Sequence, residues 1–278
     1  MLEIRNLWVR YRGADKYVLR GVNLSLSGGL VLIVGRTGCG KTTLARCISG
    51  LIPHFFPADV KGEIDVLGVN PIVCGIRGLA GRLAYLSQNP EMFVVSLNVE
   101  DEIVFPLTNL GVDREDIIRR LNNTVRRLGI EDLLDKNTLM LSSGQLQLVS
   151  IASALITGAR VLILDEPLAR LDPLNARAIS RVLREIAGGG RLVVIFEHHL
   201  DYILQYADSV VVMDDGEIVF TGSPRKALDL MMDVDVPEIV ELFHDLYLEG
   251  CVDRIPMSLE EAIEVINNAK SRGHMVQI

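Results

Sequence analysis

A glycine-rich loop near the start of the chain has the residue types and spacing that suit phosphate chemistry. The pattern G-x-x-x-x-G-K-[ST] is matched by Gly35, Arg36, Thr37, Gly38, Cys39, Gly40, Lys41 and Thr42, and Thr43 follows. In such a loop, glycines let backbone N–H groups turn toward phosphate oxygens, and the N-terminus of the following helix adds positive potential. Lys41 can reach the β- and γ-phosphates, and the Thr42 hydroxyl can bind Mg²⁺. The pattern predicts a site for a nucleoside triphosphate, against the alternative of an ordinary glycine-rich turn before a helix.

Two carboxylates follow a second apolar run, residues 161–164. Asp165 ends the predicted strand, where it can hold Mg²⁺ directly or through water, opposite Thr42. Glu166, the next residue, can instead face an attacking water as a general base. Acidic residues after a strand also serve as helix caps, but beside a phosphate loop the pair indicates a hydrolytic site.

Short apolar runs at residues 30–34, 161–164, 192–196 and 210–213 have the length and the two apolar faces of buried parallel strands. Helical patterns lie between them, so we predict an α/β fold with a phosphate-loop parallel sheet. Residues 2–9, 18–26 and 62–66 alternate polar and apolar side chains, which predicts a small antiparallel sheet near the N-terminus. A helix is predicted from Leu44 to near Gly50.

Helical patterns also dominate two further regions. Segments 114–128 and 144–156 predict a helical subdomain over about residues 89–158 within a domain of residues 1–225. Residues 226–278 are predicted to be a helical extension. In it Pro237 sits in a first turn, Ser258 and Glu261 form a capping box, and two apolar faces follow. These faces comprise Ile239, Leu242, Phe243 and Leu246, and then Leu259, Ala262, Ile263 and Ile266.

Composition narrows the possible partners and compartments. Of the 278 residues, 49% are hydrophobic and 23% are charged, as in a globular protein with a filled core. The formal net charge of −8 disfavours a nucleic-acid partner, which requires a basic face. No apolar run approaches the roughly 18 residues that span a bilayer, and the N-terminus lacks a signal-peptide pattern. We therefore expect a soluble, cytoplasmic chain, which is still able to dock on something that is not.

The four cysteines, Cys39, Cys47, Cys74 and Cys251, have no metal-ligand spacing, which indicates free thiols in a reducing compartment. Cys39 lies close to a predicted helix N-terminus and to Lys41, surroundings that favour a reactive thiolate. An inert buried thiol is the equal alternative.

Four more motifs stand in a fixed order around these two: Gln88 within residues 86–91, the run LSSGQ at 141–145, Leu171-Asp172-Pro173, and Glu197-His198-His199. Together they resemble the ATP-binding cassette (ABC) ATPases over about residues 1–225. Segments 88–91, 99–103 and 197–201 are similar to the ATPases of energy-coupling factor transporters, a subgroup that includes those of cobalt and nickel importers. The tail around residues 236–240 also resembles that subgroup.

The resemblance implies roles for the matching positions. Residues 35–43 would form the phosphate loop, and Asp165 would be the acid on the metal side, with Thr42 and Gln88 as further metal ligands. Gln88 would also be the lever between the Mg²⁺ site and the membrane partner. Glu166 would be the base and His198 the switch residue on the γ-phosphate, with His199 as its rival.

An aromatic ring is expected against the adenine base. Tyr11 lies 24 residues before Gly35, where the family places this ring, and Tyr17 is its competitor. Stacking on a base is worth on the order of 1 kcal/mol.

The family's signature segment acts on the nucleotide of a second subunit. Here it comprises Ser142, Ser143, Gly144 and Gln145, at a helix N-terminus whose N–H groups would bind the γ-phosphate in trans. The resemblance therefore implies a head-to-tail dimer, with an identical chain or a close relative, and Asp172 at its interface.

Three positions depart from the family pattern. Ser143 replaces a glycine, Leu148 stands where arginine is usual, and Arg170 stands where a small residue is usual. Ser143 adds a side chain where backbone meets phosphate, although its hydroxyl is able to cap the helix. We expect ATPase activity of modest rate.

The resemblance implies an ATPase, with ATP and Mg²⁺ as cofactors, that drives uptake of a vitamin or transition-metal ion. Integral-membrane scaffold and substrate-binding subunits would be its partners, and ATP-dependent closure of the dimer would drive them. The alternatives are an ordinary ABC importer, a soluble ABC ATPase, and a phosphate-loop enzyme such as a kinase. Residues 89–105 contain Met92, Phe93, Val94, Val95 and Leu97, which predict either a groove for the membrane partner or a buried segment.

Overall fold

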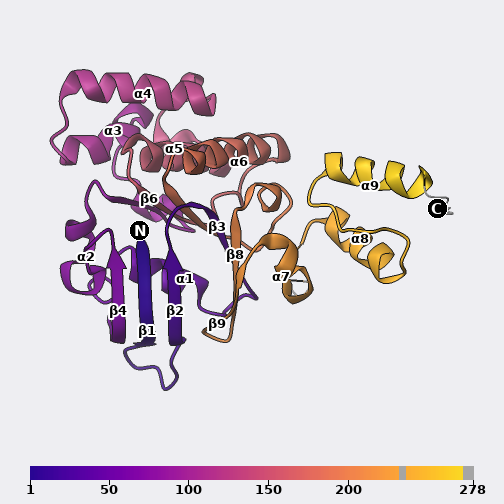
Figure 1. Ribbon diagram of the computed structural model, residues 1–278. Helices are drawn as coiled ribbons and strands as arrows, with labels where there is room; N and C mark the ends of the chain where they lie inside the picture. Colours follow the sequence, from indigo (N-terminus) through magenta and orange to yellow (C-terminus); the bar gives the residue numbers. More distant parts are fainter. Residues whose placement is uncertain (232–235, 272–278) are drawn as a thin grey trace.

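The computed structural model describes residues 1–231 and 236–271 (Figure 1). A six-stranded sheet is its centre, and every strand except the last is parallel to its neighbours. In spatial order the strands are β5 (Leu83–Leu86), β6 (Val161–Asp165), β7 (Leu192–Phe196), β3 (Gly29–Val34), β8 (Ser209–Asp214) and the antiparallel β9 (Glu217–Gly222). The four predicted buried strands are all present, and the mixed α/β fold class is confirmed.

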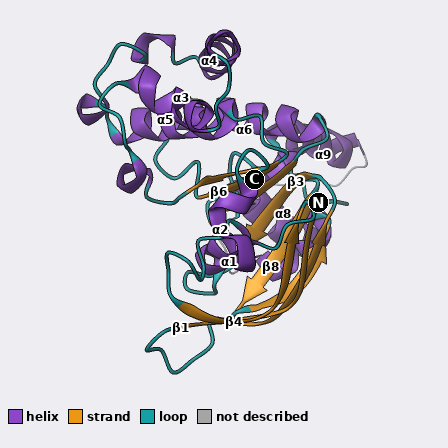
Figure 2. Ribbon diagram, turned by 90° about the vertical axis from the view of Figure 1, so that its left-hand side faces the viewer, coloured by secondary structure: helices purple, strands orange, loops and turns teal. Residues whose placement is uncertain are grey.

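A second sheet of three antiparallel strands lies below the first (Figures 1 and 2). Its order is β2 (Leu19–Leu26), β1 (Leu2–Tyr11) and β4 (Ala58–Val66). Alternating side chains are buried in β1 and β2, such as Leu2, Ile4, Leu24 and Leu26. These side chains form one core with α1 (Lys41–Ile48) and one face of the large sheet. The alternation read from the sequence therefore produced the expected sheet with one face in solvent.

The other face of the large sheet is covered by helices (Figure 2). The helices that pack there are α3 (Val99–Asn109), α4 (Arg114–Leu128), α5 (Ser143–Ile156) and α6 (Pro173–Gly188), while α2 (Pro71–Leu79) packs beside β4. The segment 114–128 was predicted at its observed bounds. Helix α1 begins at Lys41, three residues before the predicted start, because the phosphate loop leads straight into it.

The C-terminal helices project to one side of this body (Figure 1). They are α7 (Pro224–Met231), α8 (Glu238–Leu248) and α9 (Leu259–Ser271). Within this region, Arg225 on α7 binds the segment before α9 through the Ile255 carbonyl at 2.7 Å, and α9 itself through the Glu261 carboxylate at 2.6 Å. Residues 232–235 and 272–278 of the predicted extension lie outside the described residues.

Several expectations for these helices were wrong in detail. Pro237 is the N-cap of α8 and precedes its first turn. Ser258 does accept a bond from the Glu261 N–H, but the Glu261 side chain is used by Met257 N and Arg225. The buried face of α9 uses Ala262 and Val265, whereas the other predicted members are at least one third exposed: Leu259, Ile263 and Ile266. On α8, Phe243 is buried as expected but Leu242 is exposed.

Among the described residues, no helix is both long and apolar enough to cross a bilayer.

Candidate nucleotide site

The phosphate loop joins β3 to α1 at the C-terminal edge of the large sheet. Its glycines are required by space as well as by backbone angle: a Cβ on Gly35, where φ is +153°, would lie 2.2 Å from the Met213 carbonyl oxygen. The loop closes around the Lys41 ammonium group, which donates to the carbonyls of Gly35 at 2.6 Å and Arg36 at 3.2 Å. This places a nearly buried cation at the centre of a ring of backbone groups, as phosphate binding requires.

Asp165 lies beside the start of α1, although it is far away in sequence. Its Oδ1 atom is 3.5 Å from the Thr42 hydroxyl, and its Oδ2 atom is buried with no hydrogen-bond partner. Burial raises the pKa of this carboxyl to about 6. A buried carboxylate oxygen without a partner, next to a hydroxyl, is a set of hard oxygen donors that fits Mg²⁺.

No group of three or more His, Cys, Asp or Glu residues within residues 1–231 and 236–271 could hold a metal ion.

Glu166 adopts a strained backbone conformation, with φ at +51°. Three contacts hold the segment in this shape. The Glu166 N–H donates to the Phe196 carbonyl at 2.8 Å, the Gln147 amide donates to the Pro167 carbonyl at 2.9 Å, and the Leu168 N–H donates to Glu197 at 3.1 Å. Non-glycine residues with positive φ concentrate at functional sites, because the surrounding structure must hold them.

His198 faces this carboxylate. Its Nδ1 atom is 3.4 Å from Glu166 Oε1, and its ring stacks at a tilt on His199 with centroids 4.0 Å apart. The contact with Glu166 supports His198 over its rival His199 as the residue that acts at the nucleotide.

Gln88 and Tyr11 approach the same edge from other elements. Leu86 pairs with Leu164 in register, so Gln88 leaves β5 beside the strand that ends at Asp165, and its side chain is exposed. Tyr11 ends β1, and its hydroxyl is 3.2 Å from the Thr43 hydroxyl. Tyr17 instead contacts the edge of the Trp8 ring. The structure thus brings Tyr11 next to the phosphate loop and gives Tyr17 a different neighbour.

The signature segment opens α5. Ser142 is the N-cap and forms a full capping box with Gln145, while Ser143 occupies the first helical position and is exposed. The expectation that Ser143 caps the helix is therefore wrong, because Ser142 already accepts the Gln145 N–H. Gly144 packs closely on its own chain: a Cβ there would lie 3.0 Å from the Arg170 carbonyl oxygen.

Asp172 and Cys39 are both more structural than their motifs suggest. Asp172 caps α6 by accepting the N–H groups of Leu174 and Asn175, each at 3.0 Å.

The Cys39 thiol is buried, and desolvation raises its pKa although Lys41 opposes the change. The expectation of a reactive thiolate at Cys39 is wrong, because burial outweighs the nearby positive charge.

The segment after Gln88 exposes apolar side chains. Met92, Phe93, Val95 and Leu97 are each at least half exposed. Leu139 and Met140, next to the signature, are 76% and 82% exposed, and Thr138 hydrogen-bonds Leu97 and Ser96 across the two segments. The alternative that residues 89–105 are entirely buried is therefore wrong. We name these six exposed side chains the apolar surface.

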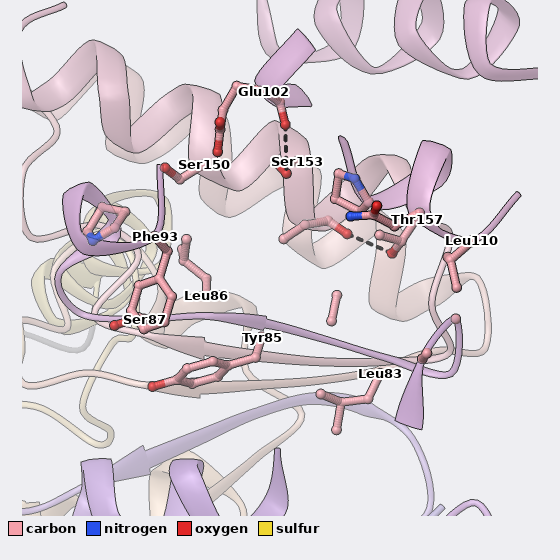
Figure 3. Close-up of a pocket in the computed structure, with 17 residues that line it drawn as sticks. Leu83, Tyr85, Leu86, Ser87, Phe93, Glu102, Leu110, Ser150, Ser153 and Thr157 are labelled. Carbon is pink, nitrogen blue, oxygen red and sulfur yellow. Dashed lines mark hydrogen bonds between the residues drawn. The ribbon is translucent and has the colours of Figure 1, made fainter. Parts of the chain in front are cut away.

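A cavity of about 390 Å³ opens beside this surface (Figure 3). Its walls come from β5, including Tyr85 and Leu86, and from α5, including Ser150 and Ser153. Glu102 lies at its rim and is 8% exposed, because its carboxylate accepts the N–H groups of Val95 and Ser96. This carboxylate thus ties the segment that carries Phe93 and Val95 to α3.

Comparison with known proteins agrees with the geometry of this edge. Residues 19–169 match the family model of the ABC transporter. The chain belongs to the ABC transporter family. The domain that carries the phosphate loop, Asp165 and the signature helix is therefore the ATP-binding and ATP-hydrolysing cassette of that family.

Relatives extend the match over nearly all of the chain. An ABC transporter ATP-binding protein of Pyrococcus horikoshii is 31% identical over 280 residues, which cover 98% of this chain and 99% of the relative. One from Methanosarcina acetivorans is 36% identical over 273 residues, but this chain spans only 42% of that relative's length. The structure of cbiO1 from Clostridium perfringens, part of the ABC transporter complex cbiONQ, matches with a TM-score of 0.71 and 29% identity. That match covers 89% of this chain and 94% of cbiO1.

Sequence reasoning did not identify three residues that shape the site. Gln147 and Glu197 hold the segment that follows Glu166 through hydrogen bonds to Pro167 and Leu168. Arg170 binds Glu91 at 2.7 Å and Asn89 at 3.0 Å. Arg170 was noted only as a departure from the family pattern. An acidic residue directly after the apolar run 192–196 was the signal available for Glu197.

Proposed function

We propose that the chain is the ATP-hydrolysing subunit of an importer of the energy-coupling factor type. It would drive uptake of a vitamin or transition-metal ion through integral-membrane scaffold and substrate-binding subunits. One observation supports the ATPase activity in this proposal: a single edge of the large sheet carries Lys41, Thr42, Asp165, Glu166 and His198.

Each residue of that edge has a role that its chemistry allows. The loop N–H groups and the Lys41 ammonium bind the phosphates, and Thr42 and Asp165 hold Mg²⁺, with Gln88 as a further ligand from β5. Bound Mg²⁺ neutralises phosphate charge and orients the leaving group. Glu166 accepts a proton from the attacking water, and His198 contacts the γ-phosphate. Tyr11 stacks on the adenine.

The active unit in this proposal is a head-to-tail dimer. The N-terminus of α5 carries no acidic residue in its first turn, and Ser142 and Ser143 are exposed there. Apart from the Gln145 N–H, which Ser142 accepts, its first N–H groups would bind the phosphates of a second subunit, whose own α5 would serve this one. Closure on ATP and opening after hydrolysis would move the membrane partner, and Asp172 would lie at the interface.

The membrane partner would dock on the apolar surface and its cavity. Largely exposed apolar side chains on two segments in contact are unusual on a protein that has no partner, and four of the six, Met92, Phe93, Val95 and Leu97, follow Gln88 closely in the chain. The domain division that we propose is a cassette of residues 1–225, with the helical subdomain at about 89–158 carrying this surface, and an extension of residues 226–278. The chain would then work on the cytoplasmic face of the cell membrane.

The energy-coupling factor subgroup is supported by the resemblance of segments 88–91, 99–103 and 197–201 and by cbiO1, whose match covers most of this chain. An ordinary ABC importer is the alternative with a membrane partner, and a soluble ABC ATPase is the alternative without one. Purification of the tagged chain from membranes distinguishes them: a scaffold with several spans supports an importer, and no membrane partner supports the soluble class.

Replacement of Lys41 by Ala tests the nucleotide site itself. Loss of charged hydrogen bonds, each worth about 1.5–3 kcal/mol, should weaken ATP binding by roughly 10- to 150-fold. Calorimetry measures the dissociation constant, and Lys226→Ala, at an exposed lysine on α7, is the control. Equal ATP affinity in Lys41→Ala and the parent chain would show that the site lies elsewhere.

A further inference from the structure

Glu197 is a buried acid to which the proposed hydrolysis gives no role. It follows β7 directly, and its side chain is completely buried. Both carboxylate oxygens are occupied: Oε1 accepts the Leu168 N–H at 3.1 Å, and Oε2 accepts the His198 N–H at 3.2 Å. One side chain therefore ties together the segment that follows Glu166 and the segment that carries the histidine.

The same carboxylate also faces the histidine ring. His198 Nδ1 is 4.0 Å from Glu197 Oε2 and 3.4 Å from Glu166 Oε1. Two acids, each directly after a different strand, thus lie within 4.0 Å of the same nitrogen of one imidazole. The other nitrogen of this ring is Nε2.

This arrangement selects one protonation form of the ring. Two carboxylates near Nδ1 favour a proton on that atom, and the field of a charge is stronger in a water-poor site than at the surface. When both ring nitrogens carry protons, Nε2 can donate a hydrogen bond to an anionic oxygen such as that of a phosphate. A neutral ring with its proton on Nδ1 would instead present a lone pair at Nε2.

We propose that Glu197 is a positioning residue that keeps a proton on Nδ1 of His198 and fixes this histidine relative to Glu166. The kinetic part of this inference rests on the proposed ATPase function. The geometric part does not, because both contacts are made within one chain.

The groups around Glu197 are consistent with this role. Burial raises the pKa of the Glu197 carboxyl to about 7, the bonds from Leu168 and His198 lower it, and the Glu166 charge raises it. The His199 ring packs against the His198 ring, with centroids 4.0 Å apart.

The first experiment needs no substitution at Glu197 and no ATPase activity. Nitrogen-15 spectra of the full chain with labelled histidine report which ring nitrogen carries a proton, and His198→Ala identifies the signal. We expect a protonated Nδ1 at about pH 8, where the Glu197 carboxyl, with its pKa of about 7, is mostly ionised. A ring with a bare Nδ1 and a proton only on Nε2 would overturn the inference, whatever the fate of the proposed function.

The second experiment separates positioning from general support of the fold. Glu197→Gln keeps the shape but removes the charge, and kcat should fall by about 10- to 100-fold, as when the support of a metal-binding histidine is removed. ATP affinity should stay within about threefold, because the phosphate loop is untouched. The pH at which His198 gains its second proton should fall.

A double-mutant cycle completes the test. In a His198→Ala background, Glu197→Gln should change kcat by less than about twofold if Glu197 acts through the histidine. Equal losses in both backgrounds would show a merely structural role and overturn the inference. Thermal unfolding checks that each variant folds; if Glu197→Gln does not, the protonation of His198 in the parent chain decides.

Discussion

The edge of the large sheet that carries the phosphate loop, Asp165 and Glu166, here called the nucleotide edge, and the apolar surface lie on either side of Gln88. The two regions differ in the kind of side chain that they bury. At the edge, polar side chains are buried and hydrogen-bonded to the surrounding chain, as with Lys41 and Glu197, while Asp165 keeps one buried oxygen without a partner. On the surface, Met92, Phe93 and Leu139 remain exposed although they are apolar. The first region is organised before its ligand arrives, whereas the second gains stability only when a partner covers it.

The difference shows how binding at one region can reach the other. Glu102 holds the apolar segment through the N–H groups of Val95 and Ser96, and Arg170 holds its beginning through Glu91. A rigid edge and a segment fixed at both ends can transmit a small movement without losing their own geometry. This is the property expected of a cassette that drives a partner.

The largest effect should come from the edge. Glu166→Gln keeps the size of the side chain but removes the proposed base, and loss of a positioned base lowers rates by about 10²–10⁴. ATP should still bind, and the closed dimer should accumulate in the presence of ATP, as measured by light scattering. Hydrolysis at the parental rate would mean that another group accepts the proton.

The apolar surface should respond in the opposite manner. Phe93→Ser with Val95→Ser should leave the basal ATPase rate unchanged but weaken binding to a membrane scaffold. Each buried side chain of this kind contributes roughly 1.5–3 kcal/mol when fully covered, so the dissociation constant should rise at least tenfold. Co-purification from membranes measures the binding.

Val73→Ser is the matched control, since Val73 is 72% exposed on α2 and is not one of the six side chains of the apolar surface. Equal loss of scaffold in the control would show a nonspecific effect. If the double variant loses solubility and basal activity, these residues support the fold and the docking site lies elsewhere.

The buried acid of the edge should make stability depend on pH. The pKa of Glu197 is raised from 4.5 to about 7, so between these values the folded state binds more protons than the unfolded state. The free energy of unfolding should therefore fall as the pH rises through this interval, by an amount on the order of 2 kcal/mol. Glu197→Gln should flatten this slope, which denaturant titrations at several pH values measure.

The pKa of Asp165 is also raised, so this carboxyl contributes to the slope in the same direction. Its contribution is present in both the parent chain and Glu197→Gln, and the difference between their slopes therefore reports on Glu197. An unchanged slope in Glu197→Gln would mean that this carboxyl does not titrate in the folded chain as its burial suggests.

The sequence predicted the chemistry of the edge better than its support. The phosphate loop, Asp165 and His198 were singled out because phosphate chemistry dictates their residue types and order, and the fold brings them to one sheet edge. The bonds of Glu197 to Leu168 and of Arg170 to Glu91 join residues 29 and 79 positions apart, and only the folded chain brings them together. No local pattern could have indicated these contacts.

The helices and strands were likewise predicted where a local pattern was strong and missed where it was weak. Long apolar strands and the amphipathic helix 114–128 were predicted, but α3 was missed because Pro106 lies inside it and its apolar face is weak. Strand β5 has only four residues, too few for a period to show. On α9 the choice between Val265 and Ile263 for the core depends on what packs against the helix, which its own sequence does not specify.

The smallest effect should come from the ion pair between the two regions. Arg170 binds Glu91 at 2.7 Å with side chains that are 28% and 48% exposed, so the pair contributes at most about 1 kcal/mol to folding. Arg170→Ala should leave basal hydrolysis within about twofold but reduce stimulation by the membrane scaffold, because the segment after Gln88 loses one of its two anchors. Arg127→Ala removes a similar pair, with Glu185 at 2.7 Å on the helical face, and serves as the control. Equal changes in scaffold-stimulated ATPase rate in the two variants would show that Arg170 has no special place between the regions. A loss confined to Arg170→Ala, at unchanged stability, would identify this departure from the family pattern as part of the coupling.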